Sequence, residues 1–174
     1  KYLVRVQEGV PLAVRICETE AYIGRMDKAC HAYHYKRTKR TETLFAPPGT
    51  AYIYLIYGMY HCLNCVTEAE GEPAAVLIRA GEPVTSADAD AISVRRFRCT
   101  TAELSSYQKK NFLNGPGKLC KGLSLTTVQN GISLTGDTLY LLDSGEQPRT
   151  IHAGKRIGID YAEEAANFPW RFYL

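Results

Sequence analysis

The chain has 174 residues, of which 45% are hydrophobic and 22% charged, and its formal net charge is +3 at pH 7. This composition is typical of one globular domain with a sizeable core, and the mild positive charge permits a nucleic-acid partner without requiring one. No run of about eighteen apolar residues exists, which excludes a membrane-spanning helix, and no signal peptide is visible, so we expect a protein that is not secreted.

The first segments of the chain have the pattern of strands. Alternating apolar residues predict strands over 2–6 and 12–22, separated by a turn at Gly9 to Pro11. Because the chain begins at Lys1 directly in a strand and without Met, we expect the natural protein to carry a leading segment that is missing here.

A long polar and basic loop is predicted over 23–48. Loops of this length inside a compact domain are usually functional or disordered. Four cations gather in it, at Lys36, Arg37, Lys39 and Arg40. His31 lies on the same loop, and the loop pattern alone predicts an ordinary exposed histidine.

The next segment is rich in tyrosine and predicts a hairpin. Strands are expected over 51–56 and 61–66, and Gly58 supplies the backbone freedom of the turn between them. Tyr57 falls at or next to the tip, where an exposed aromatic side chain is poor for stability but suits a wedge that enters another molecule. Nearby cations favour a polyanion with stacked bases as that molecule. The alternative is that the tyrosines pack in a core or on a sheet face, since strands favour tyrosine.

The rest of the chain mixes strands with helices. A strand over 74–80 completes a predicted antiparallel meander, helices are expected over 86–97, with Ser86 as N-cap, and over 101–112, and strands over 139–142, 155–159 and 171–174. Gly115 and Gly117 open a short helix that ends at Gly122, where free backbone N–H groups and Lys118 suit an anion; a plain loop before a helix is the alternative. The predicted fold is α+β: a single mixed domain over 1–174, around a curved antiparallel sheet with a protruding β-hairpin.

Two carboxylates could carry chemistry. Strand alternation places Glu18, Glu20 and Tyr22 on one face, which indicates either a proton-transfer site, with one of the two carboxylates as general base, or a solvated strand face. Arg79 lies in an otherwise apolar strand, so its guanidinium needs a carboxylate partner, and we expect Glu18 or Glu20 to supply it.

The cysteine pattern gives little support to a metal site. Of six cysteines, only Cys62 and Cys65 form a short pair. That spacing suits zinc in a knuckle turn, but in a strand the two side chains point to opposite faces. We expect free thiols, and no metal or cofactor; a zinc-dependent hydrolase is the weakest alternative.

These residues together resemble a known family. The matching motifs, in chain order, are Glu20-Ala21-Tyr22, His31, Pro48-Gly49-Thr50, the tyrosine run from Tyr52 to Tyr60, Asn64, Leu77-Ile78-Arg79-Ala80, Gly115-Pro116-Gly117-Lys118-Leu119 and Arg171-Phe172-Tyr173. In this order they are similar to the alkyladenine DNA glycosylases, or methylpurine-DNA glycosylases, of the mammalian type, over nearly the whole chain.

The resemblance implies a role for each matched residue. Glu20 is expected to be the general base that activates water, with Arg79 and the main-chain carbonyl of Ile157 as further ligands of that water. The base pocket would consist of Tyr22, His31 and Tyr54, which stack around the flipped base, and Asn64, which excludes guanine. Tyr57 would intercalate, and Arg37, Arg40 and Lys118 would meet the DNA backbone.

The resemblance also implies an activity. We expect a monofunctional DNA glycosylase of base excision repair that flips alkylated or deaminated purines (3-methyladenine, hypoxanthine, ethenoadenine) out of double-stranded DNA and hydrolyses the N-glycosidic bond. It is expected to act as a monomer, in the cytoplasm at the bacterial nucleoid or in a nucleus. The alternative is a non-catalytic binder of distorted or damaged nucleic acid. The loop from Arg37 to Thr41 departs from the family's Arg-Thr-Pro-Arg-Asn, which leaves base preference and phosphate contacts open.

Overall fold

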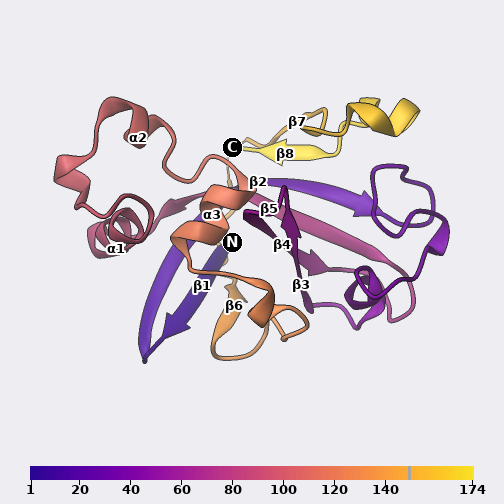
Figure 1. Ribbon diagram of the computed structural model, residues 1–174, viewed down its shortest axis with the longest axis horizontal. Coiled ribbons are helices and arrows are strands. Elements are labelled where there is room, and N and C mark those ends of the chain that lie inside the picture. The colour runs from indigo at the N-terminus through magenta and orange to yellow at the C-terminus, as the bar shows by residue number, and fades with distance from the viewer. Residues whose placement is uncertain (149) are drawn as a thin grey trace.

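One curled antiparallel sheet of eight strands forms the framework of the protein in a computed structural model, which describes residues 1–148 and 150–174 (Figure 1). With its helices this is the predicted α+β fold. The strands are β1 (Tyr2–Gln7), β2 (Val10–Ile23), β3 (Ala51–Ile56), β4 (Tyr60–Val66), β5 (Ala74–Pro83), β6 (Leu139–Leu142), β7 (His152–Gly154) and β8 (Arg171–Tyr173). The predicted strands in the first half and at 139–142 and 171–174 are thereby confirmed.

The strand order is not the simple meander that the sequence predicted. The path is β3-β4-β5-β2-β1-β6, so β1–β2 and β3–β4–β5 are neighbours in sequence order, whereas β5 pairs with β2 and not only with β4. The physical reason is the length of β2, which has 14 residues. Its early residues 10–15 pair with β1, residues 18–20 pair with β8, and residues 14–23 pair with β5. β2 is therefore the central strand, and it connects the site to the end of the chain.

Three α-helices accompany the sheet within the described residues. They are α1 (Ser86–Phe97), α2 (Ser106–Lys110) and α3 (Pro116–Gly122), and 3-10 turns cover Tyr33–Tyr35, Glu42–Phe45, Thr101–Glu103, Thr127–Gln129 and Asp160–Asn167. In Figure 1, α1 and α2 lie on the left of the view, and the yellow C-terminal segment lies at the upper right. Among the residues that the structure describes, every helix is too short or too polar to cross a bilayer.

Three local predictions were wrong. The N-cap of α1 is Thr85, whose side chain accepts from the backbone N–H of Asp88, and not Ser86. The expected helix over 101–112 divides, because Leu104 is extended and Ser105 caps a new helix. The expected strand over 155–159 is displaced to β7, since Gly158, with a φ of +76°, breaks any extended run there.

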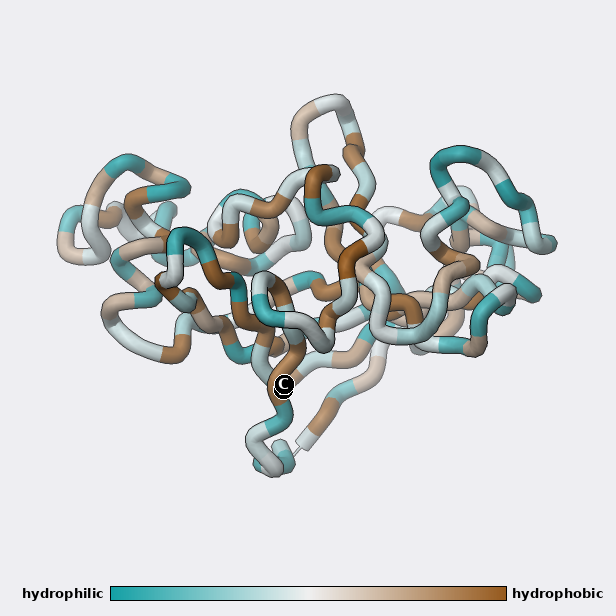
Figure 2. Tube along the Cα trace, turned by 90° about the horizontal axis from the view of Figure 1, so that it is seen from below, coloured by the Kyte–Doolittle hydropathy of each residue, from teal (hydrophilic) through white to brown (hydrophobic). Residues whose placement is uncertain are grey.

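Two apolar clusters position the site. The larger one joins the sheet to α1 and α3 and includes Leu3, Leu63, Ile92, Leu119 and Leu123. The second joins the loop after β2 to β3–β5 and consists of Cys30, Ala32, Leu44, Phe45, Tyr52, Val66 and Ala75, with Tyr22 and Tyr54 packed against it. Hydrophobic segments accordingly gather in the middle of the molecule in Figure 2, and hydrophilic ones are frequent in the outer loops. The second cluster fixes the long loop against the sheet, which brings His31 to the aromatic residues.

Candidate active site

A cavity of about 610 Å³ opens where the long loop, the hairpin, α3 and the segment after β7 meet. Eight of the predicted site residues line it: Tyr22, His31, Tyr54, Tyr57, Asn64, Arg79, Lys118 and Ile157. Glu20 is fully buried and is not itself a lining residue, but it contacts three of them, Tyr22, Arg79 and Ile157. Arg37 and Arg40 are not among the lining residues, although Arg40 lies against one of them.

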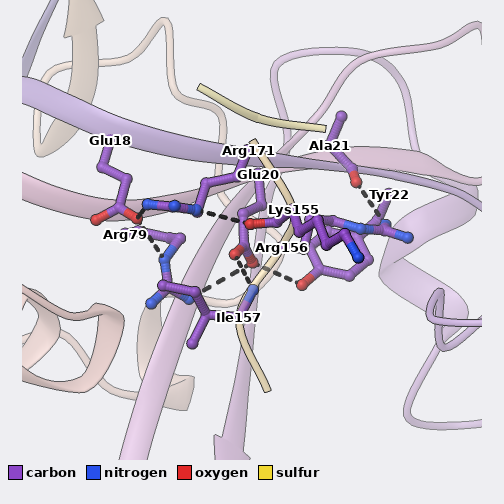
Figure 3. A network of polar contacts seen from close by, with 9 residues as sticks. All are labelled: Glu18, Glu20, Ala21, Tyr22, Arg79, Lys155, Arg156, Ile157 and Arg171. Atoms are coloured by element: carbon purple, nitrogen blue, oxygen red, sulfur yellow. Dashed lines mark hydrogen bonds and ion pairs between the residues drawn. The ribbon is translucent and has the colours of Figure 1, made fainter. Parts of the chain in front are cut away.

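The Glu20 carboxylate is fully buried and receives donors from three segments (Figure 3). The backbone N–H of Ile157 donates to Oε1 at 2.7 Å, and the hydroxyl of Tyr22 donates to Oε2 at 2.7 Å. The Arg79 guanidinium lies 3.5 Å from Oε2. A buried carboxylate is stable as an anion only when it is compensated in this way. The sequence left open the alternative that Glu18 and Glu20 lie on a solvated strand face. For Glu20 this alternative is wrong.

Arg79 reaches both carboxylates because the sheet is irregular at this point. The β2–β5 register shifts on both sides of Glu18, and neither Cys17 nor Arg79 has a partner in it. Such bulges re-aim side chains and are frequent beside active sites. Arg79 Nε donates to Glu18 Oε1 at 3.2 Å, and Arg171 donates to the same oxygen at 3.0 Å. Glu18 is thus held by two cations, of which Arg171 does not line the cavity, while all three groups that hold Glu20 belong to lining residues.

His31 is not the exposed histidine that the loop pattern predicted. Its Nδ1 lies 2.9 Å from the hydroxyl of Tyr52, and its ring meets the Tyr54 ring edge-on, with centroids 4.6 Å apart. Burial, together with the nearby Arg40 cation, lowers the pKa of His31 to about 4. The imidazole is therefore neutral at pH 7, so it adds no positive charge to the cavity.

Tyr52 is a site residue to which the sequence assigned no role. It is 2% exposed, and burial raises the pKa of its hydroxyl to about 12. The backbone carbonyl of Tyr52 accepts from the side-chain amide of Asn64 at 3.1 Å. Its signal in the sequence was its place two residues before Tyr54, which puts both rings on one face of β3.

The turn between β3 and β4 presents Tyr57 to solvent. Tyr57 is 78% exposed, and the nearby Met59 is 67% exposed. Tyr57 and Gly58 have φ values of +54° and +67°, and the N–H of Met59 donates to Ile56 at 3.2 Å, which is the geometry of a type I′ turn. A positive φ is unusual for a bulky side chain. The alternative that Tyr57 packs in a core is wrong.

The three predicted backbone cations have different surroundings. Arg37 forms an ion pair with Glu42 at 2.6 Å, and the guanidinium of Arg40 lies 5.2 Å from the centroid of the Tyr54 ring. Lys118 Nζ donates to Asn111 at 2.8 Å and to Asn114 at 2.7 Å, and burial, followed by the Arg96 cation, lowers its pKa. Lys118 is therefore held at the mouth of the cavity by two neutral acceptors, with no carboxylate among its hydrogen-bond partners in the described part of the chain.

The cysteine pair offers no metal geometry. Cys62 lines the cavity, whereas Cys65 lines a separate groove on the other side of the sheet. All six cysteines are free thiols. Within residues 1–148 and 150–174, no cluster of three or more His, Cys, Asp or Glu side chains is placed to hold a metal ion.

Known proteins are similar in sequence to this chain along its entire length. The model of the family described as "Methylpurine-DNA glycosylase (MPG)" matches residues 1–174. A protein from Clostridium perfringens (strain SM101 / Type A), named "Putative 3-methyladenine DNA glycosylase", is 52% identical over 177 residues, which cover 100% of this chain and 85% of the relative. Relatives of the same name from Alkaliphilus oremlandii and Clostridioides difficile are 48% and 46% identical and are covered to 85% and 90%. The chain belongs to the methylpurine-DNA glycosylase family and is thus a hydrolase that acts on N-glycosyl bonds in DNA.

Proposed function

We propose that this chain is a monofunctional glycosylase that removes alkylated or deaminated purines from double-stranded DNA with a water molecule activated by Glu20. One observation carries the proposal: a fully buried carboxylate is held by three residues that line an aromatic cavity, which an exposed tyrosine tip also lines. This is the arrangement that base removal needs, because the reacting sugar must leave the duplex before water can reach it.

Capture of the base is assigned to the aromatic residues. Extrusion of a nucleotide costs roughly a few kcal/mol, and a wedge in the gap recovers stacking worth about 1–3 kcal/mol. Tyr57, which is 78% exposed at the hairpin tip, would be that wedge. Tyr22, His31 and Tyr54 would enclose the base, and their electron-rich faces attract a purine that alkylation has made cationic. Asn64, held by Tyr52, would exclude the exocyclic amino group of guanine.

The chemical step is hydrolysis. Water attacks the anomeric carbon while the N-glycosidic bond breaks and its electron pair leaves with the base, and Glu20 accepts the proton that the water loses. Arg79, whose guanidinium lies 3.5 Å from the carboxylate, would orient the water together with the main-chain carbonyl of Ile157. Because the described hydrogen-bond and ion-pair partners of Glu20 include no lysine, we expect no Schiff base and no strand cutting.

The surroundings of the site support a duplex partner. Arg37, Arg40 and Lys118 would meet phosphates, and Lys118 is held by two neutral acceptors, whereas Arg37 is paired with a carboxylate. One chain contributes every residue of the proposed mechanism, which supports action as a monomer. The relatives named above are bacterial, which favours a bacterial nucleoid in the cytoplasm as the place of action.

The test is release of a base from defined duplexes. Wild-type protein should convert a hypoxanthine or 3-methyladenine duplex into alkali-labile abasic sites. Glu20→Gln should slow release by about 10²–10⁴-fold while lesion binding survives, because the carboxamide cannot accept the proton. Glu18→Gln is the matched control on the same strand and should slow release far less.

Two outcomes would contradict parts of this proposal. Unaltered release by Glu20→Gln would show that Glu20 is not the base. Tight lesion binding by the wild type without any release would favour the binding-only alternative.

A further inference from the structure

A buried ion pair behind the cavity has no part in the mechanism above. Asp27, on the long loop, and Arg156, after β7, both have side chains that are 0% exposed. Arg156 donates to both carboxylate oxygens of Asp27, at 2.5 and 2.7 Å. Neither residue lines the cavity. A bidentate pair removed from water is held more firmly when further donors of the guanidinium also find acceptors.

Two further donors of Arg156 are used on backbone carbonyls, one of them next to Glu20, while its buried Nε has no hydrogen-bond partner in the described residues. Nη1 donates to the carbonyl of Ala21 at 2.7 Å, and Nη2 donates to the carbonyl of Ala165 at 3.1 Å. Ala21 lies between Glu20 and Tyr22 in β2, and Arg156 precedes Ile157, whose N–H contacts Glu20. Figure 3 shows Arg156 reaching across to Ala21 beside the Glu20–Ile157 contact. One guanidinium therefore ties the segment after β7 to the strand that carries the carboxylate.

The same guanidinium also lies against a ring of the pocket. Its central carbon is 4.6 Å from the centroid of the Tyr22 ring and 5.2 Å from that of Trp170. Tyr22 lines the cavity, so a base stacked there would be separated from Arg156 by one ring. An uncompensated cation at that position would repel a positively charged purine and would leave a neutral purine little affected. Asp27 supplies the compensating charge.

We propose that Asp27 and Arg156 form a charge-neutral positioning clamp: Arg156 holds Ile157 and Tyr22 at Glu20, and Asp27 cancels its charge so that the cavity accepts cationic purines. The clamp rests on the proposed function. Both residues are positioning residues, since neither touches the space in which the base would lie.

The charge half of the proposal is tested by the substrate ratio of one variant. In Asp27→Asn, single-turnover release of cationic 3-methyladenine from methylated duplex DNA should fall relative to release of neutral hypoxanthine, by about tenfold for one uncompensated charge several ångströms away. The ratio is formed within one preparation, so loss of folded protein cancels. Asp88→Asn is the matched control, because Asp88 is also a buried aspartate but caps α1 away from the cavity. Its ratio should equal that of the wild type.

The positioning half is tested by removing both charges. The double variant Asp27→Asn/Arg156→Met should fold, because a buried ion pair is often replaced by neutral groups without loss of stability. It should keep the wild-type ratio of the two release rates. It should release both bases about tenfold more slowly, since the charge-assisted hydrogen bond from Arg156 to the backbone carbonyl of Ala21 is lost. Wild-type rates in this variant, or an unchanged ratio in Asp27→Asn, would overturn the clamp. Failure of the wild type to release either base would instead overturn the proposed function.

Discussion

Replacement of Tyr57 by glycine separates the stability of the hairpin from the capture of DNA. Tyr57 is 78% exposed, so loss of its ring removes little buried area. A φ of +54° costs a bulky residue about 1–2 kcal/mol, and glycine avoids this cost, so the substitution stabilises the turn. The greater freedom of glycine in the unfolded chain lowers the free energy of unfolding by about 0.4–1 kcal/mol. The two terms nearly cancel. We expect a free energy of unfolding within about 1 kcal/mol of the wild type, and hence a Tm within about 2–4 °C.

The affinity for DNA should respond quite differently. Loss of the wedge removes stacking worth about 1–3 kcal/mol, which weakens the Kd for a duplex with a hypoxanthine lesion by about five- to a hundredfold. Fluorescence anisotropy at fixed salt measures the Kd, and thermal unfolding measures the Tm. A large fall in Tm with unchanged affinity would refute the reasoning, because it would make Tyr57 a structural residue.

The chain offers a matched control for this substitution. Glu8 and Gly9 form the turn between β1 and β2, with φ values of +52° and +77°, and Gln7 pairs with Val10 on either side. Glu8→Gly therefore relieves the same backbone strain in a different hairpin. Its Tm should change as little as that of Tyr57→Gly, while its Kd for the lesion should equal that of the wild type.

Three further predictions concern other residues. Because the pKa of His31 is lowered from 6.5 to about 4, its neutral form contributes stability that is complete above pH 6.5 and is lost as the pH falls toward 4, by about 3 kcal/mol at most. Urea unfolding of His31→Gln between pH 6.5 and pH 4 should lack that loss; an identical pH dependence would contradict the assignment. Lys118→Met should weaken binding equally for all duplex sequences and reduce the slope of log affinity against log salt by about one, whereas an unchanged slope would exclude a phosphate contact. Elemental analysis of the purified protein should find no stoichiometric zinc, and Cys65→Ser should release bases at the wild-type rate; metal at one equivalent would revive the zinc hypothesis.

The sequence predicted those parts of the fold that depend on neighbouring residues. The hairpin from β3 to β4 follows from alternation on both sides of Gly58, and α1 follows from a cap and a periodic run. The predicted helix over 101–112 failed for an equally local reason, because Ser105 can cap a new helix as readily as it can continue an old one. Cap residues mark helix starts, and the caps at Thr100 and Ser105 begin two separate short helices within the range predicted as one.

The parts that could not be predicted are contacts between distant segments. Ile157 and Glu20 are 137 residues apart in the chain, and Arg156 and Asp27 are 129 residues apart. No period or spacing connects such pairs, since they exist only after β8 has paired with β2. The resemblance to a family named Ile157 as a site residue, but it did not indicate the Asp27–Arg156 pair.

The two carboxylates of β2 show what the distant segments add. Alternation makes Glu18 and Glu20 equivalent, because both lie on one face and both reach Arg79. The C-terminal segments make them different: Arg171 binds Glu18 as a second cation, whereas Ile157 offers Glu20 only a neutral N–H. Tyr22 and Ile157, which donate to Glu20, line the cavity, whereas Arg171, which donates to Glu18, does not. The contacts of Glu20 therefore connect it to the space proposed for the base. The proposed choice of Glu20 as general base thus depends on where residues 155–171 cross β2, and not on the strand that carries both candidates.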